Sequence, residues 1–125
     1  ARREAVKALG KKRQAEDYNF QRKWGLTAPR TGWKAWYRGT SSRVNAIRGR
    51  LEVLRTYGVD TSGIVGMPAL EQAEAENLAR QTKLSVQAGT SVSQIQQWES
   101  GGVTHHIFNM INYRERLGLI SSGVI

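Results

Sequence analysis

The clearest periodic pattern in the chain lies between Ser41 and Tyr57. Apolar residues recur there at spacings of three and four, at Val44, Ile47, Leu51, Leu54 and Tyr57. This spacing predicts a helix with one buried face, and either Ser41 or Ser42 can cap its start while Gly58 ends it. Gly49 in its interior costs about 1 kcal/mol relative to alanine, which indicates close approach of another backbone.

A shorter apolar stripe lies in the C-terminal half, at Val92, Ile95 and Trp98. It predicts a second helix, because residues three apart share a helical face. Ser91 can cap the start of this helix, and Gly89 suits the left-handed position that ends the helix before it. We expect Trp98 to be buried against Leu84 and against a further apolar helix over residues 107–111.

The N-terminal segment 1–21 has strong helix formers and many charges, but its apolar spacing lapses after Val6 and Leu9. A helix without a wide apolar stripe gains little from packing. We therefore expect a basic arm that is exposed to solvent or ordered by a partner. The plainer alternative is a charged helix that is merely solvated.

Segment 22–39 interleaves aromatic and basic residues around Pro and Gly. The aromatic residues are Trp24, Trp33, Trp36 and Tyr37, and the basic ones are Arg22, Lys23, Arg30, Lys34 and Arg38. Basic side chains neutralise phosphates, while indole and phenol rings stack on unpaired bases or anchor in a protein groove. We expect a loop with these properties, and we expect Trp33 to enter the core because exposed indoles are costly.

The charge is distributed unevenly along the 125 residues. Residues 1–50 hold 14 Lys and Arg against 3 Asp and Glu, a net charge of +11, whereas residues 51–125 hold 5 against 7, a net charge of −2. A basic half joined to a near-neutral half is typical of proteins that bind polyanions. The length allows one modest domain, not two independent cores with linkers.

The sequence lacks the residue patterns that are typical of several kinds of functional site. The chain has no cysteine, which excludes disulfides and thiolate sites. No apolar run approaches the roughly 18 residues of a membrane span, and no phosphate-binding glycine loop occurs. His105 and His106 are adjacent, so on a helix they point about 100° apart and do not form the usual metal-binding pair. We expect no enzyme, no metal, no cofactor and no membrane partner.

The stretch Leu84–Gly101 resembles the second half of a helix-turn-helix of the Cro and lambda-repressor type. The features that carry the likeness are Gly89, Ser91 and the run Trp98-Glu99-Ser100-Gly101. Further matches are Gln81, Leu70 and Ala73 upstream, and Ile107, Met110, Ile111 and Leu117-Gly118-Leu119 downstream, so the likeness covers about residues 70–119. The family's turn before Gln81 is replaced by Leu78-Ala79-Arg80, which allows the first two helices to fuse. Tyr113 and Arg114 also replace small or aliphatic core residues.

A weaker likeness concerns the turn Gly89-Thr90-Ser91-Val92 after Lys83-Leu84. This turn is similar to one in the RNA-binding M domain of signal recognition particle proteins. That family is rich in methionine and arginine, whereas this chain has two Met and Lys83 alone near the turn.

These patterns together predict an all-α protein: a small helical bundle with a helix-turn-helix-like C-terminal half and a basic N-terminal arm. We expect residues 1–40 to form the arm, 41–66 the amphipathic helix and connector, and 67–125 the helix-turn-helix-like domain. We expect a non-catalytic nucleic-acid-binding protein, with DNA favoured over RNA, that forms a homo-oligomer or joins a larger assembly.

The repressor resemblance implies that Gln81 holds the nucleic-acid backbone and that one face of the 91–98 helix reads duplex bases. That face comprises Ser91, Ser93, Gln94 and Gln97. This helix has no Lys or Arg, so phosphate affinity must come from the N-terminal half. The candidate phosphate contacts there are Arg22, Lys23, Arg30, Lys34, Arg38, Arg43, Arg48 and Arg50.

Two alternatives remain open. The chain can be a structural nucleoprotein component of a virion or ribosome, with its extension along nucleic acid and its helical part docked on protein. It can also be a protein-only adaptor, which would tolerate loss of the arm. The expected location is accordingly the cytoplasm and nucleoid, or the interior of a virion or ribosome.

Overall fold

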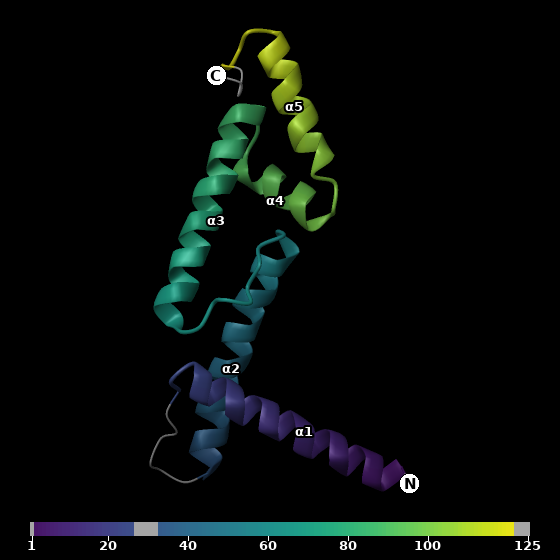
Figure 1. Ribbon diagram of the computed structural model, residues 1–125, viewed down its shortest axis with the longest axis vertical. Coiled ribbons are helices and arrows are strands. Elements are labelled where there is room, and N and C mark those ends of the chain that lie inside the picture. Colours follow the sequence, from purple (N-terminus) through teal and green to yellow (C-terminus); the bar gives the residue numbers. More distant parts are fainter. Residues whose placement is uncertain (1, 27–32, 122–125) are drawn as a thin grey trace.

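The computed structural model describes residues 2–26 and 33–121, with the side chains of 13–15, 17–18 and 33–41 outside that description. Over this part of the chain the secondary structure is all helical, as the sequence predicts. The elements are α1 (Arg2–Lys23), α2 (Trp33–Thr56), α3 (Met67–Ala88), α4 (Val92–Ser100) and α5 (His105–Arg116). Figure 1 shows α3, α4 and α5 together at one end of the molecule and α1 crossing α2 at the other.

The buried apolar side chains form two clusters that share α3. The first cluster comprises Trp24, Ile47, Leu51, Leu54 and Leu70, and the second comprises Ala88, Ile95, Ile107 and Ile111. Leu70, in the first turn of α3, and Ala88, its last residue, are both 0% exposed. A chain too short for two separate domains thus builds two small cores on one helix, without a linker between them.

The apolar stripe of α2 is buried as expected, from Val44 to Leu54. The start of this helix differs from our expectation. α2 begins at Trp33, so Ser41 and Ser42 lie inside the helix and not at its start, and residues 33–39 form helix instead of loop. Once the buried stripe holds the later turns, each earlier residue adds a hydrogen bond at little cost. The expected close approach at Gly49 is also wrong, because nothing lies within 4 Å of a Cβ built there.

Helix α1 is the exposed arm that the sequence predicts, and its C-terminal end is fixed to α2. Phe20 stacks on Trp24 with ring centroids 5.6 Å apart, and the Arg48 guanidinium carbon lies 5.0 Å from the centroid of the Phe20 ring. Trp24 and Gln21 are buried. Every described side chain of α1 from residue 2 to residue 19 is exposed, and Figure 1 shows this half of α1 pointing away from the other helices.

Helix α3 is continuous through Leu78-Ala79-Arg80, where repressor-type proteins have a turn. Helix formers at these positions leave no reason for a break. The helix ends at Gly89, which has φ 69° as predicted. The Thr90 amide donates to the Ser85 carbonyl and the Gly89 amide to the Val86 carbonyl, which satisfies the end of the helix.

Helix α5 buries less than the resemblance implies. Ile107 and Ile111 are buried, but Met110, Leu117 and Leu119 are exposed. One face of this 12-residue helix covers α3 and α4, which leaves Met110 on another side exposed, and Leu117 and Leu119 follow the end of the helix. Trp98 packs on the second cluster and lies 5.8 Å from His106 between ring centroids, yet it is half-buried instead of fully buried.

Candidate nucleic-acid interface

The turn between α3 and α4 has the caps that the sequence predicts at Gly89 and Ser91. Three residues, Gly89, Thr90 and Ser91, separate the two helices. Ser91 has extended backbone, and its side-chain oxygen accepts a hydrogen bond from the Gln94 amide at 3.1 Å. This bond satisfies one of the free amides at the start of α4 and fixes the direction of the helix.

The outward side of α4 carries most of the residues predicted to read bases. Ser91, Ser93 and Gln97 are exposed, and Gln94 is partly exposed. Ile95 is 0% exposed and faces the second cluster. The structure therefore places four of the five residues predicted from the resemblance on or beside one surface, with amide and hydroxyl groups available to a partner.

The fifth residue, Gln81, does not belong to that surface. It is 0% exposed, its Nε2 donates to Glu99 Oε1 at 2.9 Å, and its Oε1 accepts from Gln96 Nε2 at 3.1 Å. In this structure Gln81 is therefore buried and paired inside the protein, away from the surface at which it was expected to contact a nucleic-acid backbone. Because α3 is continuous, Gln81 lies in the middle of a helix rather than at the exposed start of one.

Among the predicted phosphate contacts on α2 whose side chains the structure describes, Arg43 differs from Arg48 and Arg50, which both have partners inside the protein. Arg43 is exposed. Arg48 lies over the Phe20 ring, and Arg50 forms a two-point ion pair with Glu74 of α3. This hydrogen bonding raises the pKa of Arg50 and lowers the pKa of Glu74, because each charged group stabilises the other. Arg50 therefore connects α2 to α3.

The remaining predicted contacts lie on and after α1. Arg22 and Lys23 are exposed in its last turn. Arg30 lies outside the described residues, as do the side chains of Lys34 and Arg38, although the backbone of both is in α2. The side chain of Trp33, which we expect in the core, also lies outside the described residues.

The structure adds a row of basic residues to the candidate interface. Arg3, Lys7 and Lys11 are all exposed on α1, and their spacing of four places them on one face of the helix. Arg22 continues the same face three turns later. The spacing was readable in the sequence. The apolar pattern around them lapses after Leu9, so the sequence does not indicate which side of a helix would be exposed.

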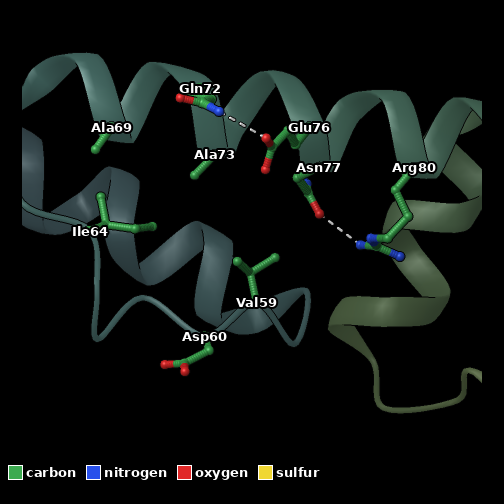
Figure 2. A pocket seen from close by; sticks show the side chains of 9 residues that line it. All are labelled: Val59, Asp60, Ile64, Ala69, Gln72, Ala73, Glu76, Asn77 and Arg80. Carbon is green, nitrogen blue, oxygen red and sulfur yellow. Dashed lines mark hydrogen bonds between the residues drawn. The ribbon is translucent and has the colours of Figure 1, made fainter.

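A cavity of about 430 Å³ lies between α3 and the connector that precedes it. Figure 2 shows Val59 and Ile64 on the connector side and Ala69 and Ala73 on α3, so much of the wall is apolar. The polar residues that line it are Asp60, Gln72, Glu76, Asn77 and Arg80. Hydrogen bonds from Ser62 lower the pKa of Asp60. The residues that line the cavity include no Ser, His or Cys.

Among the residues that the structure describes, no group of three or more His, Asp or Glu is placed to hold a metal ion. No helix in the same part of the chain is long and apolar enough to cross a membrane. Comparison of the chain with protein-family models, with curated proteins and with solved structures gives no match.

Proposed function

We propose that this chain is a non-catalytic nucleic-acid-binding protein whose affinity comes mainly from α1. The observation that carries the proposal is the exposure of this helix. Arg3, Lys7 and Lys11 project into solvent, and every described side chain of the helix from residue 2 to residue 19 is exposed. Most of the stability of a helix in a protein comes from packing of one face, so a partner that neutralises the charge of this helix also supplies stability that packing does not.

The chemistry of α1 fits a phosphate backbone better than a small anion. The face from Arg3 to Arg22 extends over about 28 Å at 1.5 Å per residue, which corresponds to several successive phosphates of one strand. Its charges lie in a row and form no enclosed site. Such a row contributes affinity and salt dependence, but it does not discriminate between sequences.

The second part of the proposal assigns base contacts to α4 on duplex DNA. Ser93, Gln94 and Gln97 face outward, and a glutamine amide can pair with adenine through two hydrogen bonds in the major groove. The capped turn at Ser91 and the resemblance to repressor-type helices support this assignment. Ser91 itself acts as the cap.

A structural role in a nucleoprotein particle, such as a virion or ribosome, is the second candidate. The observation that favours it is the set of large apolar side chains left exposed on and after α5: Phe108, Tyr113, Leu117 and Leu119 are each more than half exposed. Monomeric soluble proteins rarely expose many such residues close together. In this case α1 follows nucleic acid while α5 docks on protein.

The test compares binding of the full chain to duplex DNA, single-stranded DNA and structured RNA by fluorescence anisotropy, followed by selection from a randomised duplex library. Gln94→Ala and Gln97→Ala are expected to cost about 1–3 kcal/mol at one or two base pairs. Gln72→Ala on α3 is the control and is expected to leave the selected sequence unchanged.

The possible outcomes separate the candidates. Binding without any selected sequence would reject base reading by α4 and favour the structural role. Absence of binding to all three nucleic acids would reject the proposal as a whole.

A further inference from the structure

One face of α3 is exposed and carries no charge over more than three turns. Its members are Ala75, Leu78, Ala79, Thr82 and Val86, all of them exposed. At 100° per residue they fall within an arc of about 100°. Leu78 is 52% and Val86 69% exposed. The Thr82 hydroxyl donates to the Leu78 carbonyl at 2.7 Å, so Thr82 presents mainly its methyl group.

The other helices leave this face open. Helices α2, α4 and α5 all contact α3, and Figure 1 shows them on one side of it, with the opposite side of α3 at the edge of the molecule. The buried residues of α3, among them Leu70, Gln81 and Ala88, point towards those helices. The small side chains of Ala75 and Ala79 allow another helix to approach the open side closely.

The charged residues beside this face have opposite signs at its two ends. In an antiparallel pair of such faces, acidic residues of one copy would therefore lie opposite basic residues of the other. Glu76 and Lys83 are both exposed, lie seven residues apart and so share one flank of the face. At the ends lie Glu71 and Arg114. Arg114 reaches from α5 to donate to the Val86 carbonyl at 3.2 Å. The N-terminal half of this surface is therefore acidic and the C-terminal half basic.

We propose that this face of α3 is a self-association interface, in which α3 packs antiparallel against α3 of a second copy about a two-fold axis. With the axis near Ala79, Lys83 lies opposite Glu76 of the second copy, and Arg114 lies near the second copy's Glu71. A two-fold interface makes each of these pairs twice. The same register places the apolar residues of the two faces against each other, and the proposal does not depend on the proposed function.

The first test is sedimentation equilibrium of the full chain and its variants over a wide concentration range. Wild type is expected to be dimeric at high concentration, and Leu78→Glu is expected to weaken dimerisation about tenfold or more by placing a charge in the apolar face. Leu117→Glu is the matched control, because Leu117 is similarly exposed, at 54%, but lies at the C-terminal end of α5, away from the α3 face. Circular dichroism verifies that both variants keep their helices.

A second test addresses the register. Glu76→Lys and Lys83→Glu are each expected to weaken the dimer, and the double variant is expected to restore it, because the charges are exchanged on both copies. The chain has no cysteine, so single cysteines can be used as probes. Ala79→Cys is expected to form a disulfide-linked dimer on oxidation. Ala75→Cys is not, because the two copies of residue 75 lie about 13 Å apart along an antiparallel pair.

The result that overturns the proposal is a wild-type chain that remains monomeric at several hundred micromolar, or a dimer that Leu78→Glu leaves intact. Crosslinking through Ala75→Cys with no crosslink through Ala79→Cys would overturn the antiparallel register.

Discussion

Arg80 of α3 holds Glu99 of α4 through two hydrogen bonds, from Nη1 to Oε2 at 2.6 Å and from Nη2 to Oε1 at 3.0 Å. The Glu99 side chain is 6% exposed and that of Arg80 41%. Gln81 donates to the same carboxylate, and Asn77 accepts from Arg80 at 2.7 Å. A buried carboxylate is thus neutralised and hydrogen-bonded where α4 meets α3, which fixes the orientation of the helix assigned to base contacts.

Removal of Arg80 is expected to leave Glu99 buried without its countercharge. Arg80→Ala should lower the free energy of unfolding by about 2–3 kcal/mol, less than for a fully buried pair because Gln81 still donates to the carboxylate. Urea denaturation measures the change. Glu52→Ala is the control: it removes a partner of an exposed ion pair, and its cost should stay below about 1 kcal/mol. Equal stability of Arg80→Ala and wild type would show that the ion pair does not stabilise the fold.

Two glycine substitutions are expected to act in opposite directions. Gly49→Ala should stabilise the protein by about 0.5–1 kcal/mol, because this position is in the interior of α2 and has open space around it. Gly89→Ala should destabilise it by about 1 kcal/mol, because φ is 69° there and the new Cβ would displace the Arg114 guanidinium. Thermal denaturation compares both variants with wild type. Destabilisation by Gly49→Ala would indicate a neighbour at that position that the structure does not show.

The ion pair between Arg50 and Glu74 predicts that the free energy of unfolding falls as the pH is lowered. The folded protein holds the pKa of Glu74 below its ordinary value through the Arg50 hydrogen bonds. The resulting stability is therefore fully present above the ordinary pKa of a glutamate and is lost as the pH falls through the lowered pKa. Because the pair is partly exposed, its contribution at neutral pH is about 0.5–1 kcal/mol.

Glu74→Gln should therefore be less stable than wild type at pH 7, and its free energy of unfolding should change less with pH between about 3 and 5. Urea denaturation at a series of pH values measures this. Glu4→Gln, on the exposed arm, serves as the control and should follow the wild-type curve. A pH dependence in Glu74→Gln as steep as that of wild type would contradict the assignment.

Local patterns in the sequence were sufficient to predict several elements. The stripe from Val44 to Leu54 has a strict helical period, and Gly89 and Ser91 have backbone preferences that suit the end of one helix and the start of the next. Each of these features depends on residues close together in the chain. The all-helical fold followed from them without any knowledge of tertiary contacts.

The features that the sequence did not predict depend on contacts between distant segments. Gln81 and Glu99 are polar, and nothing in either local sequence indicates that they are buried together with Gln96. The sequence alone leaves Arg50 among the candidate phosphate contacts, because its partner, Glu74, lies 24 residues away. The extension of α2 back to Trp33 was missed because Gly39 and the two serines in this segment are usually turn and cap residues.

The claim that α1 provides the affinity for nucleic acid is tested most directly by the salt dependence of binding. The measurement is the slope of log affinity against log salt concentration for binding to a duplex. This slope is negative, and it becomes steeper by about 0.9 for each phosphate that the protein neutralises. A variant with Arg3, Lys7 and Lys11 all changed to Gln is compared with a charge-preserving variant in which the same positions carry Lys, Arg and Arg. We predict that the neutral variant binds more weakly and that its slope is shallower by about 2–3, while the charge-preserving variant keeps the wild-type slope. An unchanged slope in the neutral variant would contradict the account.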